Sequence, residues 1–320
     1  MKNDTQYMVS VIIVTYNQEQ WISQTMESVL GQKTTYPFEV IVGNDCSKDA
    51  TGTICQKFAD EYPNVTLLNR TQNMGCVPNW VDCASRASGK YVMMLDGDDF
   101  WNNENKIQIE VDYMESHPEC VILHTDNDRL NIRTNQLERN IKQKSGIIVP
   151  QGKIQKELFS GRGAIATNSV CFRRDVFAKH VPLDKYLELG LLGADYPTWV
   201  ILSAYGEVHY LPISTYTYRV GQESLTSRAN YDWIRHRYET EKRQAKWLLN
   251  MFPNLGIYTQ DDERFYDNYC SHQLLLAAYR NNDSASAKTF AKGDKMPNWK
   301  TKMASTWLTF QLARWYSNRK

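Results

Sequence analysis

The sequence predicts an α/β fold with a mostly parallel central sheet, followed by a helical C-terminal extension. Within the first 100 residues, four short apolar runs alternate with segments whose apolar residues recur at helical spacing. Each apolar run ends in polar or glycine-bearing residues. Strands that alternate with helices are joined by crossovers, and crossovers leave neighbouring strands parallel. Beyond about residue 227 the periodicity is helical throughout.

Composition narrows the class of protein. The chain has 320 residues, a net charge of +1 and 42% hydrophobic residues, so it can bury a large core and is neither disordered nor a general nucleic-acid binder. Seven scattered cysteines without a CxxC pair predict no disulfide framework or zinc cluster. No apolar signal core and no run of ~20 apolar residues is present. We therefore expect a cytoplasmic protein, or one peripheral on the cytosolic face of a membrane.

The first four strands read as continuous apolar runs, which is typical of strands buried on both faces of a parallel sheet. We expect Asn17 to cap the first helix. No GxGxxG follows the first strand and no GxxxxGK[ST] occurs, which argues against a dinucleotide oxidoreductase and a P-loop NTPase. The expected strands are residues 9–16, 38–42, 65–68 and 91–95, and the helices between them are residues 17–30, 50–62 and 77–87.

An acidic turn, Asp-Gly-Asp-Asp at residues 96–99, follows the fourth strand and begins with a DXD motif. Its three carboxylates repel one another and are costly to bury unless a cation neutralises them. Carboxylate oxygens suit Mg²⁺ or Mn²⁺ shared with a phosphate-bearing ligand. The alternative is a solvated turn in which Asp98 or Asp99 caps the next helix.

The order of the strands favours the first interpretation. Thr15, Tyr16 and Asn17 stand at the end of the first strand, and Asp45 stands at the end of the second. Ligands of parallel α/β sheets bind beyond the carboxyl ends of the strands. We therefore predict a nucleotide site there, with the phosphates held through a metal ion rather than by a glycine-rich helix start.

The second half of the chain is less regular. Asp195 precedes an amphipathic helix, where a carboxylate is commonly an N-cap or first-turn residue without a catalytic role. The expected elements are a strand at 120–125, a polar hairpin or lid at 126–144, a short strand at 147–149, a helix at 151–159, a strand at 164–172, and helices at 198–205, 231–251 and 262–281.

Residues 9–226 resemble the family 2 glycosyltransferases of bacterial polysaccharide biosynthesis, which have the GT-A nucleotide-sugar-binding fold. The resemblance rests on the joint order of VSVIIVTYNQEQWISQTMESVLGQ, NDCSKDAT, NMG, YVMMLDGDD, GADYPTW and YRVGQESLT. It implies a GT-A domain at 1–226, with a nucleotide half at about 1–125 and an acceptor half at about 126–226. Residues 227–320 would form the helical extension.

The resemblance implies a role for each donor-site residue. Thr15 and Tyr16 would line the nucleobase end of the pocket, and Asn17 belongs to the same donor-binding set. Asp45 would bind the base, which is usually uracil in this family, and Asp96 would approach the ribose and the adjacent phosphate. The base loop departs from the commoner DDGSTDGT pattern at Asn44, Cys46, Lys48 and Ala50.

The remaining roles concern the metal and the chemistry. Asp98 would hold Mg²⁺ or Mn²⁺, with Asp99 as support. Arg219 would contact the diphosphate or form an inward ion pair. Asp195 would be the catalytic base, because displacement at the anomeric carbon needs one base for the acceptor hydroxyl and a metal for the departing diphosphate. One base and no enzyme nucleophile means inversion of configuration.

The implied function is metal-dependent, inverting sugar transfer to a hydroxyl of a saccharide or lipid-linked saccharide, from a nucleoside-diphosphate donor, usually a UDP-sugar. Two departures leave room for a non-catalytic nucleotide-sugar-binding or assembly module: Ala194 replaces the first acid of the usual pair, and Gly221 stands where a histidine often occurs. A nucleotidyltransferase on a related fold is a further alternative, but its glycine-rich basic loop is missing.

The tail at residues 285–320 carries eight basic residues and one acid, Asp294. Ala304, Trp307, Leu308, Leu312 and Trp315 share one helical face. A basic amphipathic helix with tryptophans is typical of contact with an anionic membrane surface. Packing of the same face against the main domain is the alternative.

Overall fold

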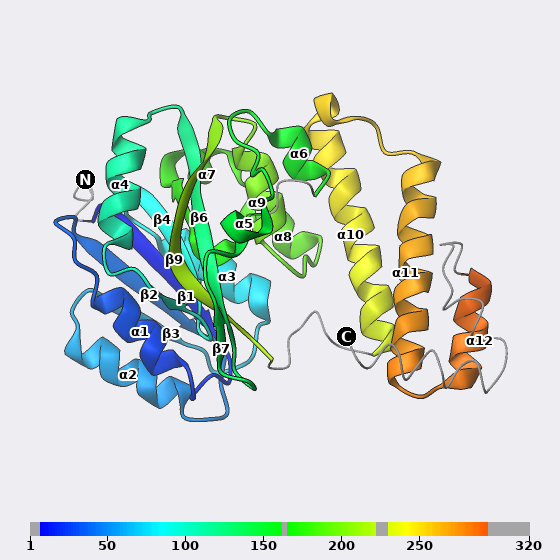
Figure 1. Ribbon diagram of the computed structural model, residues 1–320, viewed down its shortest axis with the longest axis horizontal. Coiled ribbons are helices and arrows are strands. Elements are labelled where there is room, and N and C mark those ends of the chain that lie inside the picture. Colours follow the sequence, from blue (N-terminus) through cyan, green and yellow to red (C-terminus); the bar gives the residue numbers. More distant parts are fainter. Residues whose placement is uncertain (1–6, 162–164, 222–229, 294–320) are drawn as a thin grey trace. The chain divides into compact units, whose positions relative to one another are not determined.

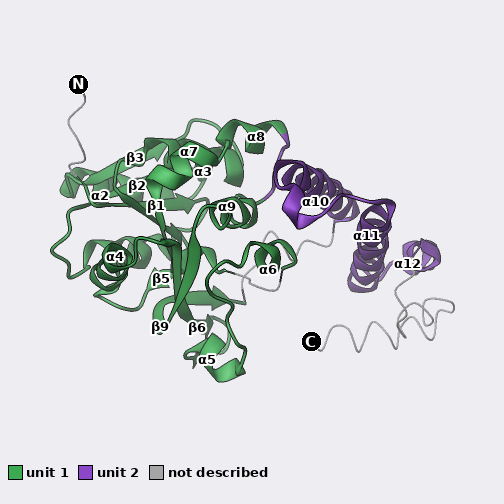
Figure 2. Ribbon diagram, turned by 90° about the horizontal axis from the view of Figure 1, so that it is seen from above, with its two compact units in different colours: residues 1–188, 193–222 green, residues 189–192, 223–320 purple. Residues whose placement is uncertain are grey.

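The computed structural model describes residues 7–161, 165–221 and 230–293 (Figure 1). The chain divides into two compact units (Figure 2), of which the first comprises residues 1–188 and 193–222 and the second residues 189–192 and 223–320. The first unit contains the sheet, and the second is helical. The predicted α/β fold with a helical C-terminal region is confirmed.

The first four strands of the sheet are parallel and lie in the order β3-β2-β1-β4. Val9 pairs with both Phe38 and Tyr91, so β1 lies between β2 and β4 and is almost wholly buried. The elements are β1 (Val9–Thr15), α1 (Ile22–Leu30), β2 (Phe38–Asn44), α2 (Thr51–Glu61), β3 (Val65–Asn69), α3 (Cys76–Arg86) and β4 (Tyr91–Asp96). The alternation predicted for this half is confirmed.

The first helix begins later than the sequence predicts, and Asn17 does not cap it. Asn17 has a positive φ of 53°, and its side chain accepts a hydrogen bond from the backbone N–H of Lys48 at 2.8 Å. The N–H of the next residue, Gln18, donates to the Thr51 hydroxyl at 2.8 Å. The chain after β1 is therefore bound to the loop after β2 before α1 can start at Ile22.

The second half of the sheet is mixed and continues in the order β4-β8-β6-β9-β5. Strand β8 is antiparallel to both β4 and β6, whereas β6 and β9 are parallel. The strands are β5 (Phe100–Trp101), β6 (Cys120–Asn131), β7 (Gln136–Glu138), β8 (Val170–Arg173) and β9 (Glu207–Val220). The helices are α4 (Lys106–Ser116), α5 (Ile141–Ser145), α6 (Gln155–Phe159), η1 (Thr167–Ser169), α7 (Arg174–His180), α8 (Leu183–Glu188) and α9 (Asp195–Leu202).

Two strand predictions in this half were wrong, and the prediction of a hairpin after residue 126 was right. Residues 147–149 form no strand, because this apolar stretch is exposed: Ile147 is 68% and Ile148 90% accessible. Within the strand predicted at 164–172, the described residues contain the short 3-10 helix η1 before β8 begins at Val170. The polar segment after β6 does form a hairpin, since β6 extends to Asn131 and pairs with β7.

The second unit consists of α10 (Tyr231–Met251), η3 (Pro253–Leu255), α11 (Gln260–Arg280) and α12 (Ser284–Gly293). A capping box between Thr259 and Asp262 starts α11. Leu275, Tyr279 and Ala287 pack between α11 and α12. Among the residues that the structure describes, no helix is long and apolar enough to cross a membrane. Most of the predicted amphipathic tail helix, residues 294–320, lies outside the described residues.

Candidate functional site

The ends of β1, β2 and β4 lie side by side, as the order of strands predicts (Figure 1). The backbone N–H of Asp45, just after β2, donates to the carbonyl of Thr15 at 3.0 Å. On the other side of β1, the N–H of Gly97 donates to the carbonyl of Val14 at 3.0 Å. The base loop and the acidic turn are therefore both attached to the end of β1.

Gly97 lets the acidic turn approach β1 closely. A Cβ atom at this position would lie 2.4 Å from Oε1 of Gln18 and 2.6 Å from Oγ1 of Thr15. Those two atoms form a hydrogen bond of 2.7 Å with each other. Thr15 is buried, whereas Tyr16 is 46% exposed and Asn17 is also exposed. Thr15 thus shapes the floor at the strand ends, and the ring of Tyr16 is accessible to a ligand.

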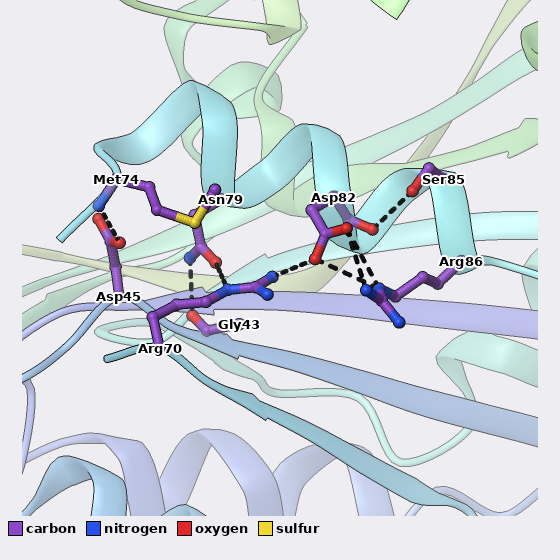
Figure 3. Close-up of polar contacts among 8 residues, drawn as sticks. All are labelled: Gly43, Asp45, Arg70, Met74, Asn79, Asp82, Ser85 and Arg86. Carbon is purple, nitrogen blue, oxygen red and sulfur yellow. Dashed lines mark hydrogen bonds and ion pairs between the residues drawn. The ribbon is translucent and has the colours of Figure 1, made fainter. Parts of the chain in front are cut away.

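Asp45 fastens the loop after β3 to the end of β2. Its carboxylate is buried and accepts hydrogen bonds from the backbone N–H groups of Met74 at 2.7 Å and Gly75 at 2.9 Å. Figure 3 shows the Met74 contact. Because each carboxylate oxygen has two lone pairs, these bonds leave capacity for a nucleobase donor. Asp45 therefore also has a structural role that the sequence did not indicate.

A polar network behind this loop was not predicted from the sequence. Asn79 on α3 donates to the carbonyl of Gly43 at 2.8 Å, and its Oδ1 accepts from Nε of Arg70 at 3.3 Å (Figure 3). Arg70 also pairs with Asp82 at 2.5 Å, and Asp82 pairs with Arg86 at 3.2 Å. Burial raises the pKa of Asp82, but the hydrogen bonds from Arg86 and Arg70 outweigh it and hold that pKa below its usual value. In the sequence, only the polar residues of the loop before α3 indicated that polar contacts form here.

The acidic turn holds more negative charge than its surroundings neutralise. Asp99 is 1% exposed, and Asp96 and Asp98 are half-buried. Burial, together with the charges of Asp98 and Asp195, raises the pKa of Asp96 to about 7. Burial, Asp98 and Asp96 raise the pKa of Asp99 well above its usual value. A cation at the turn would relieve this repulsion, so the residues fit a bound divalent ion.

The turn is not a complete metal cage. Within the described part of the chain, no group of three or more His, Cys, Asp or Glu side chains is arranged to hold a metal. Mg²⁺ keeps several waters and is commonly bound through one or two carboxylates plus substrate phosphates. An incomplete protein ligand set therefore fits a cation that arrives with a diphosphate.

Arg219 stabilises the acidic turn through hydrogen bonds. Its side chain is almost wholly buried, with the guanidinium 4.7 Å from the ring centroid of Trp21 and 4.6 Å from that of Phe100. It donates to the carbonyl of Asp98 at 2.6 Å and to the side chain of Gln24. The backbone N–H of Arg219 donates to Asp99 at 2.8 Å. Among the described residues its guanidinium makes no ion pair with a carboxylate.

Asp195 is the first residue of α9, after the N-cap Ala194. Its Oδ2 accepts a hydrogen bond of 3.1 Å from the hydroxyl of Thr167. Its charge also contributes to the raised pKa of Asp96, of which burial is the largest cause. Thr167 and the adjacent Asn168 therefore connect Asp195 to the acidic turn, although the two are remote in sequence.

This mixed α/β sheet, with carboxylates after the ends of β2 and β4 and a helical region at the C-terminal end of the chain, is typical of a GT-A-like protein. The model of the family "Glycosyl transferase family 2" matches residues 10–181. The chain therefore belongs to family 2 of the glycosyl transferases, and this membership supports a role in glycosyl transfer.

Curated relatives agree with this assignment. An uncharacterized protein of Mycobacterium tuberculosis is 30% identical over 188 residues, which are 57% of this chain and 53% of the relative. The putative teichuronic acid biosynthesis glycosyltransferase TuaG of Bacillus subtilis is 33% identical over 107 residues, 33% of this chain and 42% of TuaG. The chain spans about half the length of the curated relatives it matches.

Solved structures show the same fold. Residues 1–349 of S. aureus TarS, in complex with UDP-GlcNAc, align with a TM-score of 0.51 and 16% identity over 90% of this chain and 93% of that one. The mannosyltransferase PcManGT of Pyrobaculum calidifontis, in complex with GDP-Man and Mn²⁺, aligns with a TM-score of 0.54 and 16% identity over 98% of this chain and 88% of that one. At such identities the likeness concerns the fold alone.

Proposed function

We propose that this chain is an inverting, metal-dependent glycosyltransferase. It moves a sugar from a nucleoside-diphosphate donor, foremost a UDP-sugar, to a hydroxyl of a saccharide or lipid-linked saccharide in cell-surface polysaccharide synthesis. The observation that carries the proposal is that the acidic turn follows β4, beside the ends of β1 and β2, and is linked to Asp195 through the hydrogen bonds of Thr167 and Asn168. The catalytic domain spans 1–226, with its nucleotide half at about 1–125 and its acceptor half at about 126–226, and 227–320 is the extension.

The donor lies along the strand ends. Thr15, Tyr16 and Asn17 border the nucleobase, Asp45 binds its edge, and Asp96 faces the ribose and the adjacent phosphate. The exposed ring of Tyr16 offers a stacking surface for a base. TarS was solved in complex with UDP-GlcNAc and PcManGT in complex with GDP-Man, so both bases belong in a donor screen.

Asp98 holds Mg²⁺ or Mn²⁺, while Asp99 and Arg219 keep the turn in place. Burial and the neighbouring carboxylates raise the pKa of Asp96 and of Asp99. Both causes disfavour negative charge at the turn, which supports a cation there. When bound, the ion supplies positive charge that stabilises the departing diphosphate.

Asp195 acts as the general base. Its carboxylate accepts the proton of the acceptor hydroxyl while that oxygen forms a bond to the anomeric carbon and the bond to the diphosphate oxygen breaks. Thr167 orients the carboxylate through its hydrogen bond of 3.1 Å. A single displacement without an enzyme nucleophile inverts the anomeric configuration.

Two substitutions test this division of labour, after UDP- and GDP-sugars have been screened for metal-dependent hydrolysis and transfer. Asp195→Asn keeps Mn²⁺-dependent nucleotide binding and loses about 10²- to 10⁴-fold in transfer rate, because only the base is removed. Asp98→Ala loses Mn²⁺-dependent binding of the nucleotide. Titration with UDP or GDP and MnCl₂ measures binding, and product analysis measures transfer and its stereochemistry.

The matched control is Asp175→Asn, since Asp175 also lies in the first turn of a helix but is exposed. It keeps both binding and transfer. Wild-type transfer by Asp195→Asn would refute the assignment of the base.

A non-catalytic nucleotide-sugar-binding module remains the second candidate. It is favoured by the position of Asp195 in the first turn of α9, where a carboxylate is stabilising without any catalytic role. The absence of an acid at Ala194 points the same way. This candidate predicts nucleotide binding without turnover by the wild-type chain, whatever donor is offered.

We also propose that the protein is cytoplasmic and that residues 285–320 contact anionic lipid, which would make it peripheral on the cytosolic face of the membrane. The described part, α12, contributes Lys288 and Lys292. The full chain should sediment with phosphatidylglycerol vesicles and not with phosphatidylcholine vesicles, and added salt should release it. A chain that ends at Ser284, and so lacks the whole tail, would disprove this contact if it sedimented equally well.

A further inference from the structure

The short 3-10 helix η1 contacts both parts of the candidate site. Thr167 donates from its hydroxyl to Oδ2 of Asp195 at 3.1 Å. Its neighbour Asn168 donates from Nδ2 to Oδ2 of Asp99 at 2.6 Å, and Asn168 Oδ1 accepts from the backbone N–H of Asp96 at 2.9 Å. Two consecutive side chains therefore bind the acidic turn on β4 and the first residue of α9.

We propose that Thr167 and Asn168 form a clamp of two positioning residues that sets the placement of Asp195 relative to the acidic turn. The proposal rests on the proposed function, because it concerns the geometry between the metal-binding and the proton-accepting group. In a displacement reaction this geometry fixes the distance between the diphosphate and the attacking hydroxyl, and small misplacements there cost rate.

Asn168 suits this place because it donates and accepts at once. Its side chain is 4% exposed and that of Asp99 is 1% exposed, so water cannot easily replace either bond. Asp99 receives its second hydrogen bond from the backbone N–H of Arg219 on β9. The carboxylate is thus held from two sides by groups on different elements, and its orientation is fixed.

The segment that carries the clamp is itself anchored. The hydroxyl of Ser169 donates to the carbonyl of Ala166 at 2.7 Å, which closes the turn. The carbonyl of Ser169 lies 3.4 Å from the buried ammonium of Lys106, which pairs with Glu110. Directly after Ser169 the chain enters β8, between β4 and β6. The segment that carries Thr167 and Asn168 is therefore attached directly to the central sheet.

Each clamp residue has a distinct expected effect. Thr167→Val keeps the shape and removes the hydroxyl, so kcat should fall about 10- to 100-fold, as for other groups that orient a site residue. The KM for the donor and the affinity for UDP with Mn²⁺ should change little. Thr167→Ser retains the hydroxyl and should restore kcat. Asn168→Ala removes both contacts to the turn and should weaken Mn²⁺-dependent UDP binding about 10- to 100-fold.

The experiment compares these variants with Ser203→Ala. Ser203 is buried at the C-terminal end of α9, and its hydroxyl donates to the backbone carbonyl of Val200. Mn²⁺-dependent binding of UDP and of GDP is measured by titration calorimetry, and turnover is measured with the nucleotide sugar found in the screen. Circular dichroism and urea unfolding check that each variant folds. Should Asn168→Ala fail to fold, Asn168→Ser takes its place, and the Thr167 pair still decides the kcat effect.

The outcomes separate the clamp from the function. If the wild-type chain binds and turns over while Thr167→Val matches Thr167→Ser in kcat, or a folded Asn168 variant binds as the wild type does, the clamp is refuted alone. If the wild-type chain shows no metal-dependent nucleotide binding and no turnover, the proposed function fails and the clamp falls with it. Loss of kcat in Thr167→Val with recovery in Thr167→Ser, together with weakened binding in the folded Asn168 variant, supports the clamp.

Discussion

At the scale of the residue, Arg219 shows how a partner decides a role. The resemblance implied either a diphosphate contact or an inward ion pair for Arg219, which the structure places near the end of β9. In the structure the guanidinium lies 4.7 Å from the ring centroid of Trp21 and 4.6 Å from that of Phe100, and it donates a hydrogen bond to the carbonyl of Asp98. A planar guanidinium in contact with two aromatic rings is poorly replaced by the compact ammonium of lysine.

We expect Arg219→Lys to lower the free energy of unfolding by about 1–3 kcal/mol, because a buried donor set and two ring contacts are lost. Mn²⁺-dependent nucleotide binding should weaken as well, since the acidic turn loses its hydrogen bond from the Arg219 guanidinium. Urea unfolding and nucleotide titration measure the two effects. Arg129→Lys, in a half-exposed pair with Glu138, is the control and should stay within about 0.5 kcal/mol. Equal stability of the two variants would contradict the support role.

At the scale of the element, α4 contains a buried ion pair. Lys106 and Glu110 are fully buried and lie 2.5 Å apart, and Lys106 also donates to the Thr215 hydroxyl at 3.0 Å. A lysine and a glutamate four residues apart are typical of an exposed helix face. The sequence alone therefore offered no sign that this pair anchors α4 to the sheet.

Removing one partner should cost more than removing both. We expect Lys106→Met to destabilise the protein by about 3–5 kcal/mol, because Glu110 would remain as an uncompensated buried charge. The double variant Lys106→Met, Glu110→Leu should recover a large part of that loss. Urea unfolding of the single and double variants measures the difference. Lys185→Met, which breaks a more exposed pair with Glu188, serves as the control. A double variant less stable than Lys106→Met would contradict this account.

At the scale of the whole molecule, the acidic turn makes stability depend on pH. The pKa of Asp96 is raised to about 7 by burial and by Asp98 and Asp195, and the pKa of Asp99 is raised as well. The folded chain therefore binds more protons than the unfolded chain above the ordinary aspartate pKa of about 4. Stability is then highest at low pH with respect to these groups, and it falls as the pH rises from about 4 to about 7.

We expect Asp96→Asn to flatten this decline, and Mn²⁺ to stabilise the wild-type chain more at pH 7.5 than at pH 5.5 because the ion competes with protons for the turn. Urea unfolding across this pH range, with and without MnCl₂, tests both statements. Asp175→Asn, an exposed carboxylate on α7, should leave the slope unchanged. A slope in Asp96→Asn that equals the wild-type slope would show that the turn does not control the pH dependence.

The parallel half of the fold was predictable because its signals are local. Continuous apolar runs identified β1 to β4, and the polar residues after them identified the edge at which Asp45 and the acidic turn meet. The predictions failed where pairing partners decide. The apolar stretch at Ile147 and Ile148 finds no strand to pair with, and Asn17 binds the loop after β2 instead of capping a helix.

By itself, the sequence determined the alternation of strands and helices, the parallel direction of the first four strands and the acidic character of the edge at which they end. Those properties follow from residue spacing and burial, which are written along the chain. The tertiary structure alone decided that Thr167 binds Asp195, that Asn168 binds Asp99, and that Arg219 is buried beneath the carbonyl of Asp98 that it binds. Such roles depend on partners far away in the sequence, and only the folded sheet brings them within hydrogen-bonding distance.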